Sequence, residues 1–166
     1  SQGDSILISY SDGKLSVPIR IHNRTGHNLP SGTTFSREVW LELVVYDEQS
    51  NILKSIGVYN NTEEIDFFDD NLMLYTSIMY DKDNLVTYEA SNAHSYIDKT
   101  LKTLSYDSRV YTIDIDDEIT SQELKITARL LFRSFKPQIL SPINHSFIDN
   151  IPILEIYRDS SYINIP

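Results

Sequence analysis

The sequence contains no cysteine. This absence excludes structural disulfides, cysteine-based zinc sites, a thiol nucleophile and the covalent attachment of c-type haem through a C-x-x-C-H motif on this chain. Long apolar runs are absent as well, because none approaches the roughly 18 residues that a membrane helix needs. We therefore expect neither covalently bound haem on this chain nor insertion into a membrane.

Basic residues are scarce. The 14 Lys and Arg residues stand against 24 Asp and Glu residues, which gives a formal net charge of −10. Such an acidic surface repels phosphate backbones and anionic lipid headgroups, and no cluster of Lys and Arg provides a local exception. We therefore expect no nucleic-acid partner.

The length of 166 residues suits one domain that spans residues 1–166. A chain of about 150 residues buries on the order of 70% of the surface that its unfolded state exposes, so a hydrophobic core can form without crosslinks. No internal repeat, low-complexity tract or linker interrupts the sequence. Because the chain begins with Ser1 rather than Met, we interpret it as a mature product or as one piece of a longer polypeptide.

The dominant hydrophobic period is two residues, which is the period of β-strands. Leu15, Val17 and Ile19 alternate with polar neighbours, and Pro18 on the polar register indicates an edge strand. Residues 37–47 are apolar on both faces and predict a central strand. The predicted strands cover residues 6–10, 14–22, 37–47, 52–60, 72–80, 85–89, 109–115, 123–133, 151–157 and 162–165.

These short strands, with turn residues between them, predict an all-β fold, namely an immunoglobulin-like antiparallel β-sandwich. At most one short helix is expected, at residues 136–148, because Pro137 and Pro142 limit its length. Residues 61–71 and 90–105 are expected to form long loops between strands.

Side chains that could carry catalysis form no recognisable pattern. The four histidines, at positions 22, 27, 94 and 145, show neither helical i, i+4 spacing nor an H-x-H pair, so a metal site would need distant partners. No G-x-S-x-G elbow, Walker loop or dinucleotide-binding glycine motif occurs. Acidic clusters at residues 63–70 and 114–118 lack the spacing of a calcium loop and indicate solvated loops. The sequence therefore predicts a protein that is not an enzyme.

Two short segments carry a more specific pattern. Residues 21–32 read IHNRTGHNLPSG, and residues 37–42 read REVWLE. Together they resemble the G-H-x-x-P-[ST]-G…R-x-x-W-L signature of the C-terminal β-sandwich domain that follows the haem-binding region in many bacterial multihaem c-type cytochromes. Residues 107–110, 128–135 and 151–156 are similar to later steps of the same pattern, so the resemblance spans about residues 17–165.

The resemblance implies an exported electron-transfer system, either periplasmic or at the cell surface. Because the C-x-x-C-H repeats of such cytochromes are absent here, it implies that haem c is carried by another part of the polypeptide or by a partner cytochrome chain. This chain would then be a non-catalytic docking module. Assembly of copies into a homo-oligomer or a filament stays open.

Within the signature, His27 and Arg37 are the candidate site residues. Gly26, Pro30 and Gly32 suit a tight loop that presents a fixed histidine at the end of a strand. A neutral His27 imidazole in such a loop could give Nε2 to the haem iron of a partner as an axial ligand; the alternative is a hydrogen bond inside the loop. Arg37 could pair with a haem propionate or with a carboxylate of this domain.

Two other functions stay open. A free-standing surface module could bind carbohydrate or neighbouring subunits through exposed sheet edges, such as the strand that carries Pro18. A metal-dependent enzyme could use His27 with acidic loop residues. Trp40, on the predicted central strand, is expected in the core rather than in an electron-transfer role.

Overall fold

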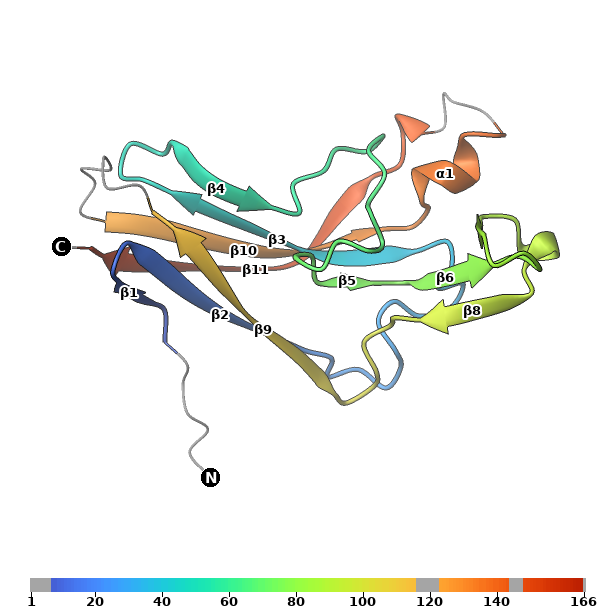
Figure 1. The fold of residues 1–166 in the computed structure, drawn as a ribbon, viewed down its shortest axis with the longest axis horizontal. Helices are drawn as coiled ribbons and strands as arrows, with labels where there is room; N and C mark the ends of the chain where they lie inside the picture. Colours follow the sequence, from blue (N-terminus) through green and yellow to red (C-terminus); the bar gives the residue numbers. More distant parts are fainter. Residues whose placement is uncertain (1–6, 116–122, 144–147, 166) are drawn as a thin grey trace.

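Two antiparallel sheets face each other in the structure, a computed structural model that describes residues 7–115, 123–143 and 148–165 (Figure 1). The smaller sheet has the strand order β1-β2-β9. Asp12 and Gly13 join its first two strands and both have positive φ, at 52° and 72°, which is the geometry of a two-residue hairpin turn. The strand bounds are Ser9–Ser11 for β1, Lys14–His22 for β2 and Tyr106–Asp114 for β9.

The larger sheet has the strand order β11-β10-β3-β4, and β5 also pairs with β3. β3 lies at its centre, because β10 covers one edge and β4 and β5 share the other. The bounds are Glu38–Tyr46 for β3, Ile52–Ile56 for β4, Leu74–Tyr75 for β5, Glu123–Arg133 for β10 and Ile153–Asn164 for β11.

A third, small sheet lies at one end of the sandwich, with the order β7-β6-β8 (Figure 1). Its strands are β6 at Ser77–Tyr80, β7 at Val86–Thr87 and β8 at Ser95–Asp98, with a 3-10 turn, η1, at Ala90–Asn92. The short helix α1, at Pro137–Leu140, follows β10 and begins at a proline, which is favoured in the first helical turn. No helix among the described residues is long and apolar enough to cross a membrane.

The main core lies between the two facing sheets. Alternate residues of β2, β9, β3 and β10 point into it and form one cluster of buried apolar side chains, which includes Leu15, Tyr111, Leu43 and Ile126. Burying each such side chain stabilises the fold by about 1.5–3 kcal/mol before the cost of ordering the chain is subtracted. The alternation of apolar and polar residues in the sequence therefore places the apolar side chains of both sheets in the core between them.

A second core covers the opposite face of β3 and β10. The connection between β4 and β5 supplies three of its buried residues, Ile65, Phe67 and Leu72. The others are Trp40, Leu74, Ile78 and Leu131. As a result, every residue of β3 except the last is buried. This double burial explains why residues 37–47 are apolar on both faces of the strand.

In the part of the chain that the structure describes, the all-β sandwich with long loops and a short helix is confirmed. β10 has the predicted bounds, β2 and β3 match theirs to within a residue, and β4 is the hairpin partner of β3. The predicted edge strand was wrong for β2 as a whole, because β2 lies between β1 and β9. Pro18 is tolerated there because β1 pairs only with Lys14, Leu15 and Ser16, so only β9 pairs with β2 at Pro18. Trp40 is fully buried, as expected, and its Nε1–H donates to Gly57 O at 2.9 Å.

Other predicted boundaries were wrong. The two strands predicted at residues 151–157 and 162–165 form one continuous strand, β11, because its pairing with β10 continues through the polar residues between them. The predicted loop at residues 90–105 contains β8, which is exposed on both faces and so has no alternation to detect. The predicted helix at 136–148 is described only as Pro137–Leu140, and residues 144–147 lie outside the described part.

Candidate functional site

Asn23 organises the loop that carries His27. Directly after β2, its buried side chain donates from Nδ2 to the carbonyl oxygens of His27, Leu101 and Lys102, at 2.8, 3.0 and 3.1 Å. Its Oδ1 accepts the backbone N–H of Thr25 at 3.1 Å, which is a turn that an asparagine side chain favours. One amide side chain thus fixes the backbone on both sides of Gly26.

The His27 ring is exposed, and one of its nitrogens is engaged. Nδ1 lies 3.0 Å from the carbonyl oxygen of Asn28. Because a carbonyl can only accept a hydrogen bond, this contact assigns the Nδ1–H tautomer to a neutral His27 ring, in which Nε2 carries the lone pair. A histidine whose second nitrogen is oriented by a carbonyl has the arrangement found in metal-ligating histidines.

A second loop, at residues 99–105, supports the first. Leu29 and Leu101 exchange two backbone hydrogen bonds of 2.9 Å each. The side chain of Asn28 donates to Thr100 Oγ1 at 3.1 Å and accepts from the backbone N–H of Thr103 at 3.2 Å. The His27 loop is therefore held by partners more than 70 positions away in the sequence.

Arg37 lies at the other end of the connection between β2 and β3, which also contains His27. Its Nη1 donates to Ser31 O at 2.6 Å. Gly32 has φ +74°, and a Cβ there would lie 2.9 Å from Arg37 Nη1, so this turn requires glycine. In the described part of the chain Arg37 forms no ion pair, so the expected carboxylate of this domain is replaced there by a backbone carbonyl. Its pairing with a haem propionate stays a prediction.

A mainly apolar groove of about 600 Å³ adjoins the base of this loop. Ile19 and Ile21 of β2 line one side, and Leu130 of β10 and Ile156 of β11 line the other, while Asn23 reaches its end. The first three are only half-buried although they pack against the main core. The sandwich is therefore open between β2 and β11.

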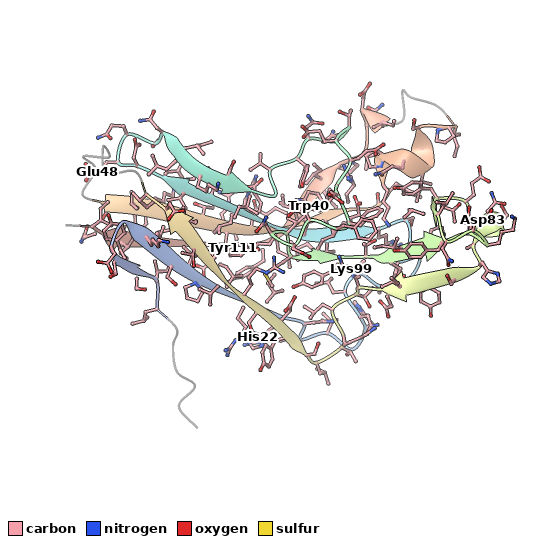
Figure 2. All side chains as sticks on the ribbon, viewed as in Figure 1. His22, Trp40, Glu48, Asp83, Lys99 and Tyr111 are labelled. Atoms are coloured by element: carbon pink, nitrogen blue, oxygen red, sulfur yellow. The ribbon has the colours of Figure 1, made fainter. Side chains whose placement is uncertain are left out.

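The other histidines lie apart from this loop. His22 is exposed at the end of β2, with its ring centroid 5.5 Å from that of Tyr106 (Figure 2). His94 is exposed and lines a separate pocket of about 370 Å³ beside β6 and β8. His145 lies outside the described residues. Among the residues that the structure describes, no three or more His, Asp or Glu side chains are grouped to hold a metal ion.

Sequence reasoning missed a buried charged cluster near α1. Arg133 and Glu38 form an ion pair with both side chains at 0% exposure, and Lys136, 1% exposed, donates from Nζ to Ser77 O at 2.9 Å. Burial raises the pKa of Glu38, although Arg133 opposes the shift. Burial lowers the pKa of Lys136 to about 8, although Glu38 opposes that shift. Glu38 and Arg133 both lie in segments of the sequence pattern, 37–42 and 128–135, but the pattern does not show that they pair, because 95 positions separate them.

The comparisons with known proteins support the fold. No family model and no curated protein matches the sequence. The structure is similar to a crystal structure of a penta-heme cytochrome c552 from Thermochromatium tepidum, with a TM-score of 0.72 and 16% sequence identity. The match covers 95% of this chain and 38% of the cytochrome chain, so this chain spans well under half of that protein. Part of a penta-heme cytochrome thus has the same sandwich fold.

Proposed function

We propose that this chain is a non-catalytic docking module of an extracytoplasmic multihaem c-type cytochrome system, in the periplasm or at the cell surface. Its fold is similar to part of a penta-heme cytochrome. Because the chain has no cysteine, a haem c of that system would be carried elsewhere, on another segment or on a partner chain. The module's own contribution is then recognition and positioning.

The observation that carries the proposal is the state of the His27 ring. An axial ligand needs an accessible imidazole nitrogen with a free lone pair and a ring that does not rotate. His27 is exposed, Nδ1 is held by Asn28 O, and Asn23 fixes the loop, so the residue fits an axial ligand for the haem iron of a partner. A bound haem would supply one-electron transfer, and His27 would orient it.

Arg37 has a supporting role in this proposal. A guanidinium group matches the two oxygens of a carboxylate, and haem propionates are carboxylates. Ser31 O and the turn at Gly32 hold the Arg37 side chain at the other end of the His27 connection. The fixed guanidinium loses less side-chain entropy on pairing than a free arginine would lose.

A haem c peptide with one histidine ligand and one open axial position tests the role of His27. The purified chain should convert the peptide from a high-spin to a low-spin absorption spectrum. His27→Ala should weaken this binding about tenfold or more, the scale on which losing a positioned ligand contact acts. His22→Ala, which removes another exposed histidine, is the matched control and should bind as the unmodified chain does.

Two results would contradict the proposal. One is an unmodified chain that leaves the haem peptide in its high-spin state. The other is a folded His27→Ala variant, verified by circular dichroism, that binds the peptide as tightly as the unmodified chain.

A second candidate function is a free-standing surface module that binds carbohydrate or neighbouring subunits through its sheet edges. β11 favours this alternative, because it is an edge strand of 12 residues on which Leu154, Tyr157 and Tyr162 are exposed. Long exposed edges promote strand pairing between molecules. Light scattering over a range of concentrations separates the two functions: self-association that Tyr157→Lys abolishes, without haem-peptide binding, would favour the second.

A further inference from the structure

Positive charge is concentrated around the His27 loop, although the chain as a whole is acidic. Residues 14–37 form β2 and its connection to β3, and they contain no Asp or Glu. Their basic side chains are Lys14, Arg20, Arg24 and Arg37. In the whole sequence, Asp and Glu outnumber Lys and Arg by 24 to 14. The segment that carries His27 therefore has the opposite sign of charge from the rest of the chain.

Two arginines of this segment have no acidic partner. The arginines of β10 and β11 each form an ion pair with a glutamate. Within the described residues, Arg20 and Arg24 form no ion pair, and both are exposed. Asp159 lines the groove together with both arginines but pairs with neither. Their N–H groups are thus available to a carboxylate from outside the chain.

Arg20 lies on the outer face of the small sheet, where negative charge is scarce. Opposite residues of an antiparallel pair share a face, and Arg20 is opposite Ser108 of β9. In β1, β2 and β9, which the structure describes in full, the only carboxylate on this face is Asp114. Asp114 pairs with Lys14 at 3.6 Å, at the end of the strands away from the His27 loop. Beside that loop, Arg20 therefore has no carboxylate of its own sheet face next to it.

Tyr106 holds the Arg20 side chain in place. Arg20 Cζ lies 5.0 Å from the centroid of the Tyr106 ring, which is 58% exposed and also contacts the ring of His22. A guanidinium over an aromatic ring is attracted to the ring face, while its N–H groups stay in the guanidinium plane and can still donate hydrogen bonds. Arg20 therefore loses less side-chain entropy on binding a carboxylate than a free arginine would lose.

Arg24 lies inside the turn that presents His27. Its neighbours are joined by the hydrogen bond of 3.1 Å from the Thr25 N–H to Asn23 Oδ1, and Asn23 also donates to His27 O at 2.8 Å. The backbone of Arg24 is thus fixed relative to that of His27. Its exposed side chain starts three residues from the candidate axial ligand.

We propose that Arg20 and Arg24 bind the propionate carboxylates of the haem whose iron His27 ligates. This inference rests on the proposed function and adds the orientation in which the partner's haem docks. The two propionates lie on one edge of a haem, and a guanidinium group matches the two oxygens of a carboxylate. The propionate edge would face the end of β2 and the outer face of the small sheet.

Arg37 contributes less to this contact than Arg20 and Arg24. Its Nη1 already donates to Ser31 O at 2.6 Å, so only its remaining N–H groups can reach a propionate. Arg20 and Arg24 donate no side-chain hydrogen bond within the described residues, so both keep the full fork of donors. We therefore expect most of the propionate binding from these two.

The local charge decides which partner surface can dock here. A net charge of −10 favours a basic partner at long range. Exposed charges more than about 10 Å apart are largely screened at 0.1 M salt, so the close contact depends on the residues beside His27. These residues favour an anionic group, and added salt should weaken its binding.

A haem c peptide with methyl-esterified propionates tests the inference. The peptide contains no Asp or Glu and has an amidated C-terminus, so the propionates are its only carboxylates. Arg20→Gln/Arg24→Gln should bind the free-acid peptide about tenfold more weakly than the unmodified chain, as followed by conversion to the low-spin spectrum. Both proteins should bind the ester equally, because the ester has no charge for the arginines to pair with.

Lys54→Gln/Lys125→Gln is the matched control. It removes the same charge from exposed positions on β4 and β10 of the larger sheet. We expect this variant to bind the free-acid peptide and the ester as the unmodified chain does. The comparison separates binding by the two arginines from the effect of net charge.

Four results would overturn the inference alone, because in each the unmodified chain still converts the peptide to its low-spin state. They are no weakening by Arg20→Gln/Arg24→Gln, equal weakening by the lysine control, a loss that persists with the ester, and an ester-sensitive loss confined to Arg37→Gln. The last result would assign the propionates to Arg37. An unmodified chain that leaves the peptide high-spin would contradict the proposed function and this inference together.

Discussion

Arg133 places two nitrogens on a single oxygen of Glu38 inside the protein. Nε and Nη2 donate to Oε2 at 2.9 and 2.5 Å, and both side chains are fully buried. Arg133 Nη1 also donates to Glu63 O at 2.9 Å, which attaches the connection between β4 and β5 to β10. Among the described residues, Glu38 Oε1 has no hydrogen-bond partner. The pair therefore joins three parts of the fold at the cost of one unsatisfied buried oxygen.

Glu38→Gln should lower the free energy of unfolding by about 3–5 kcal/mol, because it leaves the buried Arg133 charge without a counter-charge. Glu42→Gln is the matched control on the same strand. Glu42 pairs with Arg129 at 2.6 Å, but the Arg129 side chain is 32% exposed, so we expect a loss of only about 1 kcal/mol. Urea unfolding at pH 7 measures both, and equal losses would contradict the assignment of Glu38 as the structurally important carboxylate.

Lys136 should make stability increase with pH between about pH 8 and pH 10. Burial lowers the pKa of Lys136 to about 8 in the folded state from an ordinary value of 10.5. The unfolded chain therefore binds more protons in this range, which makes the free energy of unfolding rise with pH, while below pH 8 the full cost of the buried charge remains. A shift of this size corresponds to about 3 kcal/mol.

Lys136→Met removes the titrating group and serves as the reference for this prediction. The difference in unfolding free energy between Lys136→Met and the unmodified chain should change by about 2–3 kcal/mol between pH 7 and pH 10, in favour of the unmodified chain. Chemical unfolding at a series of pH values measures the difference. Parallel pH profiles for the two proteins would show that Lys136 does not titrate in this range.

The strands that bury one face could be predicted from the sequence, and the exposed ones could not. β10 alternates buried and exposed residues over its first half and has the bounds that the alternation predicts. β8 is exposed at all four positions, and the centre of β11, from Arg158 to Ser160, has the composition of a turn. These two segments are extended because they pair with a neighbouring strand. Their own hydrophobic pattern does not predict this pairing.

Only the loop that carries His27 could be predicted from the sequence, and the partners that support this loop could not. Glycine and proline around His27 indicate a fixed loop after β2, and the structure places His27 there. The support from Leu101 and Thr103 comes from the connection between β8 and β9, more than 70 residues away. Such long-range partners follow from the strand order, which hydrophobic period does not determine.

Gly57→Ala should be strongly destabilising, because the alanine Cβ would lie 2.3 Å from the backbone oxygen of Leu41 at a residue with φ +71°. Gly57 O also accepts a hydrogen bond from Trp40 Nε1–H. A backbone shift that relieved the clash would therefore disturb this bond and the position of Trp40 in the second core. We expect a loss of about 3 kcal/mol in the free energy of unfolding. Gly26→Ala is the control, since nothing lies within 4 Å of its added Cβ, and should change stability by less than about 1 kcal/mol. Similar melting temperatures for the two variants would contradict the prediction.

Asn23→Asp should release the His27 loop while largely preserving side-chain volume. The aspartate side chain has no N–H group, so the carbonyl oxygens of His27, Leu101 and Lys102 would lose their shared donor and face a carboxylate instead. Leaving buried acceptors unpaired costs about 1–3 kcal/mol each, and we expect a total loss of about 3 kcal/mol because the loop can relax toward solvent. Thermal unfolding gives the stability, and the chemical shifts of the His27 ring report the loop. Asn71→Asp, at an exposed position, should change neither; a stable Asn23→Asp variant with an unperturbed His27 ring would show that Asn23 does not position the loop.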